Sequence, residues 1–181
     1  GKDLLTFATN KRHWKVYAYT FLGAFQGVML LDFLTYTILI SMGVIDVQET
    51  ILSITKGGAI DLLGWSSLFY FASGVGTVIG SLISGKFADK SRRKTISSVY
   101  FTFIPYCFLL VLPFAFTTNF TLALIFGITF QIIFGAIQNA LMVVNQTIRG
   151  DLSRKYYPNL KSTYFALIVS LINLGQNIGT L

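Results

Sequence analysis

The sequence predicts an all-α membrane protein whose helices cross the bilayer several times. Of its 181 residues, 54% are hydrophobic and only 12% are charged, which is more apolar surface than a soluble core could bury. The apolar residues form long runs of helix-spanning length and do not alternate in the ten-residue pattern of an outer-membrane barrel. The fold class is therefore a polytopic helical bundle.

Five apolar runs are expected to be helices, since a helix needs about 20 residues to cross the hydrocarbon core. Their approximate bounds are 16–42, 62–84, 96–116, 122–144 and 164–181. We expect them to form one bundle over residues 1–181. The chain begins with Gly1 rather than Met and stops at Leu181 without a polar tail, so we expect it to be a fragment of a larger bundle.

The basic residues predict how the runs are oriented, because cytoplasmic loops carry an excess of Lys and Arg. All but one of the 14 basic residues precede the first run, follow the second or follow the fourth. Only Lys56 falls on the other side. We expect a multi-pass protein of the cell membrane with a cytoplasmic N-terminus. This asymmetry accounts for the net charge of +7, so no nucleic-acid partner is expected.

His13 lies in the basic, aromatic segment that precedes the first run. We expect it to be solvated or at the level of the lipid headgroups. A lone histidine also makes a poor metal site. The single cysteine, Cys107, excludes an internal disulfide and a cysteine metal site. No cofactor or metal is expected.

The first run holds Asp32, the one acidic residue inside an apolar run. An intramembrane carboxylate is costly unless it is paired or faces a cavity, and it often marks an ion or proton pathway. Thr35 and Tyr36 share its helical face and could form hydrogen bonds with it. Asp32 is therefore either a functional carboxylate or a structural one fixed to a neighbouring helix.

The second run contains small residues at every fourth position, namely Ala72, Gly76, Gly80 and Ser84. Such a stripe lets another helix approach closely. The third run is almost entirely aliphatic and aromatic in its outer part. We expect it to face lipid and to be kinked at Pro105 and Pro113, which membrane helices tolerate.

The fourth run is the most polar one, with Gln131, Gln138 and Asn145 recurring every seventh residue. Two interpretations remain open for this amide stripe. It lines a cavity for a polar solute, or it joins helices by hydrogen bonds that add only about 0.6 kcal/mol each on average. The fifth run carries a polar face with Ser170, Asn173 and Asn177, together with the small pair Gly175 and Gly179.

A charged bridge, residues 85–94, connects the second and third runs. It contains five basic residues, each of which would cost at least about 2.5 kcal/mol at the centre of a membrane helix. We therefore expect a loop at the cytoplasmic face. Its spacing resembles the loop signature of the major facilitator superfamily, and the matching residues are Gly85, Asp89, Lys90, Arg93 and Lys94. Arg92 departs from the pattern, because the family usually has a second glycine there.

This resemblance covers essentially the whole chain and implies five of the six helices in one half of a transporter. In that family the first and fourth helices of each half line the central cavity, which implies a substrate or ion site at Asp32, Tyr36, Gln131, Gln138 and Asn145. It also implies that Asp89 and its basic neighbours form a cytoplasmic charge relay. Gln131 stands where the family often has an arginine, which favours the C-terminal half and removes a central proton-coupling residue.

The expected function is transport of a small polar solute by alternating access, as symport or antiport coupled to protons or cations. The expected partners are the lipid bilayer, the solute, and the missing other half or a partner chain. No enzymatic constellation is present in the sequence. The alternative is a degenerate transporter half that serves as a membrane anchor or assembly subunit. A transporter should hold an open cavity near Asp32 and Gln138, whereas an anchor should fill it with side chains.

Overall fold

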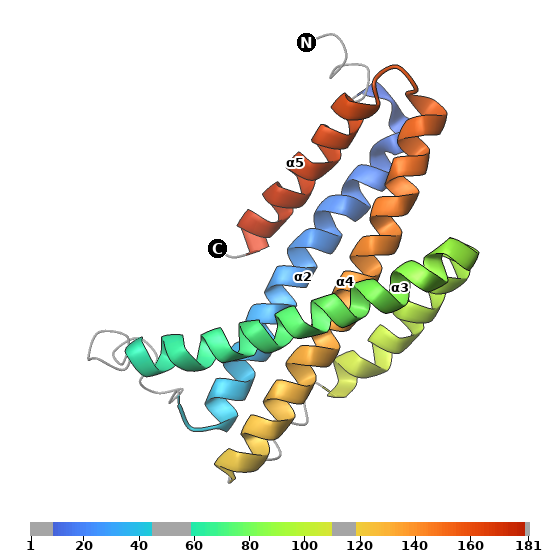
Figure 1. Ribbon diagram of the computed structural model, residues 1–181. Helices are drawn as coiled ribbons and strands as arrows, with labels where there is room; N and C mark the ends of the chain where they lie inside the picture. The colour runs from blue at the N-terminus through green and yellow to red at the C-terminus, as the bar shows by residue number, and fades with distance from the viewer. Residues whose placement is uncertain (1–8, 45–58, 110–118, 180–181) are drawn as a thin grey trace. The chain divides into compact units, whose positions relative to one another are not determined.

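The computed structural model describes residues 9–44, 59–109 and 119–179. Within these ranges every regular element is helical (Figure 1). In chain order the elements are η1 (Lys11–His13), α2 (Trp14–Ser41), α3 (Ala59–Leu109), α4 (Phe120–Tyr156) and α5 (Lys161–Gly179). The chain forms two compact units. The first combines Gly1–Leu30 with Asn145–Leu181, and the second is Leu31–Val144.

Helix α2 ends in a glycine cap. Gly43 has a φ of 71°, a left-handed conformation that side chains with a Cβ disfavour. The Gly43 N–H donates to the Ile40 carbonyl at 2.9 Å, and the Val44 N–H donates to the Leu39 carbonyl at 3.0 Å. These two bonds make a Schellman motif, which satisfies carbonyls that have no partner within the helix.

Helix α3 corrects the prediction of a loop in the charged bridge. The bridge is helical except at Ser91, whose φ of −163° and ψ of 99° are extended rather than helical. We call residues 59–90 the first arm of α3 and residues 92–109 the second arm. The chain turns back on itself between the arms (Figure 1). Exclusion from hydrocarbon constrains where these charges lie, but not their backbone conformation. Lys and Arg are good helix formers. The bridge therefore stays helical, and one non-helical residue is enough for the turn.

Helix α4 extends through residues 149–156, which the sequence placed in a cytoplasmic loop. The apolar run stops near residue 144, but no proline occurs between that residue and Pro158. Arg154 and Lys155 in the last turn also interact favourably with the negative end of the helix dipole. At the other end, Asn119 caps the helix by accepting the Leu122 N–H at 3.1 Å.

The second unit is built on a close contact between the first arm of α3 and α4. A Cβ added to Gly76 would overlap the Ile132 carbonyl, and one added to Gly80 would overlap that of Ala136. Ala72 and Ser84 are also buried. The predicted small-residue stripe is thus confirmed as a helix-packing surface.

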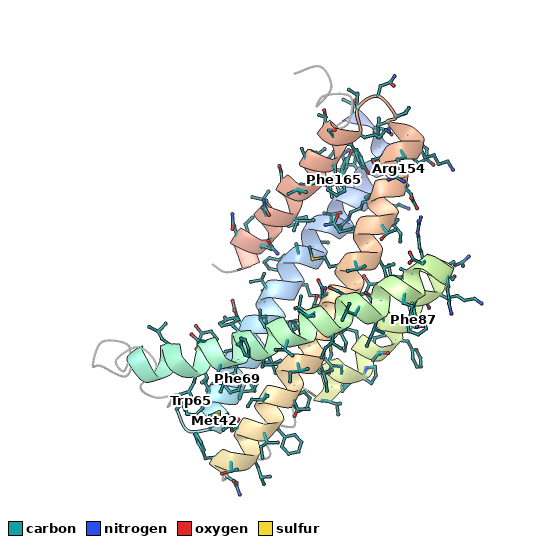
Figure 2. The ribbon with its side chains drawn as sticks, viewed as in Figure 1. Met42, Trp65, Phe69, Phe87, Arg154 and Phe165 are labelled. Carbon is teal, nitrogen blue, oxygen red and sulfur yellow. The ribbon has the colours of Figure 1, made fainter. Side chains whose placement is uncertain are left out.

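Aromatic side chains fill the rest of the second unit. Phe69 is fully buried, and it lies with Met42 and Trp65 where the end of α2 meets the start of α3 (Figure 2). In the second arm, Tyr106 is buried and donates its hydroxyl to the Phe130 carbonyl of α4 at 2.7 Å. Pro105 lies within this arm, whereas Pro113 lies outside the described residues.

The first unit places His13 in an aromatic cluster, which shows that the expectation of a solvated histidine was wrong. The ring is 2% exposed and lies 5.2 Å from the rings of Tyr156 and Tyr157 and 5.8 Å from that of Tyr164. Its Nδ1 is 3.4 Å from the Tyr164 hydroxyl. Tyrosines distant in the sequence therefore bury a residue that its basic neighbours suggested was exposed.

Helix α5 packs on α2 through the predicted small pair. A Cβ on Gly175 would meet the Phe21 carbonyl oxygen at 2.5 Å and Ala24 Cβ at 3.2 Å, and one on Gly179 would meet the Phe25 carbonyl oxygen at 2.9 Å. Both glycines thus lie at a close approach of the two helices.

Three helical stretches are long and apolar enough to cross a membrane: Trp14–Ser41, Leu63–Leu109 and Phe120–Tyr156. Helix α5 is not among these candidates in the described part of the chain. Several large apolar side chains of α3 are exposed, including Phe71 (71%), Leu82 (72%), Phe101 (79%) and Phe108 (75%). Apolar surface on this scale fits contact with lipid better than contact with water. That the third run faces lipid stays a prediction, because both arms of α3 carry such exposed side chains.

Candidate functional site

The candidate site is centred on Asp32 of α2. Its carboxylate is partly exposed, and its Oδ1 accepts a hydrogen bond of 2.6 Å from the Tyr70 hydroxyl in the first arm of α3. No Lys or Arg in the described ranges forms an ion pair with Asp32. The carboxylate therefore has one neutral donor, and hydrogen-bonding capacity remains for a proton, a cation or a solute.

The two residues expected to assist Asp32 behave differently. Thr35 is buried, and its hydroxyl donates to the Leu31 carbonyl of its own helix at 2.8 Å. Tyr36 is 53% exposed, and its hydroxyl has no hydrogen-bond partner among the described residues. Neither one forms a hydrogen bond with Asp32.

The first member of the amide stripe, Gln131, is fully buried. Its Nε2 donates to Thr35 Oγ1 at 2.8 Å, which joins α4 to α2. Its Oε1 has no hydrogen-bond partner in the described structure. A solute cannot reach this side chain in the present conformation, so its contact with a substrate stays a prediction.

The other two members of the stripe lie in different surroundings. Gln138 is partly exposed and has no hydrogen-bond partner within the described ranges. Asn145 belongs to the first unit, where its Nδ2 donates to the Tyr19 hydroxyl at 3.2 Å. Asn139, next to the stripe, donates to the Thr77 carbonyl at 3.0 Å and makes a second contact with Ser81 Oγ. Amides of α4 thus contribute both to helix packing and to accessible surface.

The charged bridge places four of the five matched residues at the surface. Asp89, Lys90, Arg93 and Lys94 are exposed, and Gly85 is partly exposed with no atom near its Cβ position. Asp89 makes no ion pair with a basic residue in the described part of the chain. Within the described structure, no ion pair of Asp89 therefore links it to its basic neighbours in a charge relay.

Tyr70 is the site residue that sequence reasoning missed. A tyrosine inside an apolar run carries a hydroxyl that needs a partner, and this was the available signal. Its pairing with Asp32 depends on how α3 crosses α2, 38 residues away in the sequence.

No family model, curated protein or solved structure matches this chain. A function is therefore proposed below from the chemistry of the residues. The described residues hold no group of three or more His, Cys, Asp or Glu side chains that could bind a metal ion. The site offers a carboxylate at Asp32 that accepts one hydrogen bond from Tyr70 and has acceptor capacity left for a cation or a polar solute.

Proposed function

We propose that this chain is half of a secondary transporter of the major facilitator type, which moves a small polar solute across the cell membrane. The observation that carries the proposal is Asp32, a carboxylate in a candidate membrane-spanning helix with a tyrosine donor and no basic partner among the described residues. Ionisable residues in such positions are expensive and commonly mark ion or proton pathways.

The proposed role of Asp32 is to couple ion movement to solute movement. In the proposal, Asp32 binds a proton or a cation and releases it when the site opens to one side of the membrane. The Tyr70 hydroxyl holds the carboxylate in one orientation through its hydrogen bond. Gln138, which is partly exposed, is available to bind a polar solute.

The residues of the charged bridge have a separate role in the proposal. Because Asp89 and Arg93 are exposed, they are free to form ion pairs with the other half of the transporter. Such pairs at the cytoplasmic face would stabilise one state of the alternating-access cycle.

The competing function is a membrane anchor or assembly subunit derived from a transporter half. The observation in its favour is that the amides of Gln131 and Asn139 donate hydrogen bonds to neighbouring helices. In an anchor, Asp32 and Tyr70 would be a structural pair and nothing more.

The test compares uphill accumulation with downhill exchange of a candidate solute in vesicles that contain the full-length protein. Asp32→Asn keeps the shape and the hydrogen-bonding capacity but removes titration. We expect it to abolish accumulation and to leave exchange partly intact, whereas Gln138→Ala weakens solute binding without uncoupling. Accumulation by Asp32→Asn at the wild-type level would show that the carboxylate is structural.

A further inference from the structure

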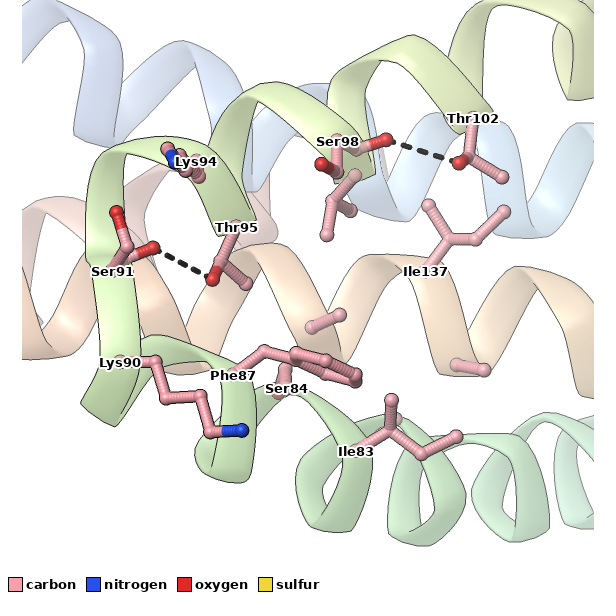
Figure 3. Close-up of a pocket in the computed structure, with 14 residues that line it drawn as sticks. Ile83, Ser84, Phe87, Lys90, Ser91, Lys94, Thr95, Ser98, Thr102 and Ile137 are labelled. Atoms are coloured by element: carbon pink, nitrogen blue, oxygen red, sulfur yellow. Dashed lines mark hydrogen bonds between the residues drawn. The ribbon is translucent and has the colours of Figure 1, made fainter.

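A cavity of about 620 Å³ lies between the two arms of α3 and α4, entirely within the second unit (Figure 3). This volume is within the roughly 300–1,000 Å³ that small-molecule pockets occupy. None of the residues proposed above as the transport site lines it, apart from Lys90 and Lys94 of the charged bridge.

One end of the cavity is positively charged. Lys90 and Lys94 lie at the same end as Ser91, where the arms meet (Figure 3). No Asp or Glu is among the lining residues, and neither ammonium group forms an ion pair with a described residue. Two cations without a counter-charge at the mouth of one cavity favour a ligand with an anionic group.

The start of the second arm adds to this positive potential. Ser91 is extended and precedes a first turn that contains Arg92, Arg93 and Lys94. The first N–H groups of a helix have no acceptor within it, and they form the positive end of its dipole. Cations are unfavourable at this end of a helix, whereas a bound anion is favoured there.

The rest of the cavity is mainly apolar, with a few hydroxyl side chains, among them Ser84 and Ser98. Ile83 and Phe87 come from the first arm, Val99 from the second, and Ile137 from α4. The hydroxyls of Thr95 and Thr102 donate to carbonyls of their own helix, at 2.8 Å and 3.0 Å. These hydroxyl hydrogens are thus not available to a ligand, which leaves the walls suited to a hydrocarbon chain.

We infer that this cavity binds an anionic phospholipid, with the phosphate at Lys90 and Lys94 and an acyl chain between the arms. The cavity lies in a candidate membrane-spanning segment, and its cationic end coincides with the charged bridge, which must lie at the level of the headgroups. A basic pocket between membrane helices is suited to a phosphate headgroup. The inference does not depend on transport, since it concerns different residues from the Asp32 site.

The test measures lipid binding to the purified full-length protein by intact-protein mass spectrometry. Phosphatidylglycerol and phosphatidylcholine with the same acyl chains are compared, and we expect tighter binding of phosphatidylglycerol. Lys90→Gln/Lys94→Gln should weaken that binding by about 20–30-fold, since each lysine near an anionic headgroup contributes about fivefold. The matched control is Lys15→Gln/Lys86→Gln, which removes the same charge from exposed residues that do not line the cavity. It should retain phosphatidylglycerol within about twofold of wild type.

A second variant tests the acyl-chain part of the cavity. Ser98 is exposed and lines the cavity, so Ser98→Trp should fill it and weaken binding of both lipids while leaving the lysines in place. If Ser98→Trp does not fold, Thr102→Trp is used in its place. Equal losses of phosphatidylglycerol binding in the two double variants would show that binding depends only on general surface charge. That result would overturn the inference. Unchanged lipid binding after the cavity is filled would also overturn it, as would displacement of the lipid by glycerol 3-phosphate alone. Occupation of the cavity by a helix of a partner protein would exclude lipid and would likewise overturn the inference.

Discussion

The hydrogen bond between Tyr70 and Asp32 is the contact that most directly connects single residues with function. At 2.6 Å it is as short as expected for a hydroxyl that donates to a carboxylate. Because it joins α2 to α3, it contributes to stability as well as to the orientation of the carboxylate. The loss of stability caused by removing the hydroxyl should therefore be measurable even before a solute is known.

Tyr70→Phe is expected to lower the free energy of unfolding by about 1.5–3 kcal/mol, the usual contribution of a hydrogen bond to a charged group. The measurement is the unfolding midpoint in detergent micelles. Tyr36→Phe is the matched control, since it removes the hydroxyl of an exposed tyrosine on the same helix as Asp32. A similar shift in both variants would mean that the Tyr70 hydroxyl contributes nothing specific.

Sequence reasoning at the residue scale identified Asp32 but not its surroundings. An acid within an apolar run stands out, because such residues are rare. Tyr70 did not stand out, since a tyrosine in a membrane helix is common. His13 was misjudged because its basic neighbours dominate locally, whereas the tyrosines that bury it lie about 150 residues further on, as with Tyr164.

At the scale of elements, the contact between α3 and α4 depends on glycines that leave room for a backbone carbonyl. Gly80→Ala places a Cβ against the Ala136 carbonyl, and backbone yields less than the end of a flexible side chain. We expect this variant to destabilise the protein by about 1–3 kcal/mol, as overpacking does. Its thermal unfolding in micelles measures the effect.

Gly74 provides the control on the same arm, because no atom lies within 4 Å of its Cβ position. Gly74→Ala should be neutral or stabilising by up to about 1 kcal/mol, since alanine favours the helix. If both substitutions raised stability alike, the stripe would not be a packing surface.

The positions of the helices were largely predictable from apolar runs, but their ends were not. The bounds of an apolar run indicate where the chain enters hydrocarbon. A helix continues past that point when the following residues favour the helical conformation. Helix α4 therefore continues past the apolar run to Tyr156, and the predicted loop at residues 85–94 became a helical turn with one extended residue.

At the scale of the whole molecule, the distribution of basic residues predicts which face is cytoplasmic. Single cysteines introduced into a Cys107→Ser background test it in intact cells. A cysteine in the segment 46–56, which lies outside the described residues, should react with an impermeant reagent. A cysteine at Ser91 should react only after the membrane is permeabilised.

The comparison is internally controlled, because permeabilised cells reveal whether each cysteine is reactive at all. Reaction at Ser91 alone in intact cells would invert the orientation. The exposed side chains on both sides of Ser91 make this residue a suitable position for labelling from the cytoplasmic face.

The reversal at Ser91 also determines how the chain tolerates changes of length. A surface loop absorbs an extra residue with little effect on the elements that it joins. In α3 a single residue makes the turn, so an amino acid inserted in the first turn of the second arm would rotate the rest of that arm by about 100°. Tyr106 would then face away from the Phe130 carbonyl that it now contacts. Substitutions in the exposed part of the bridge should therefore be accepted far more readily than insertions or deletions.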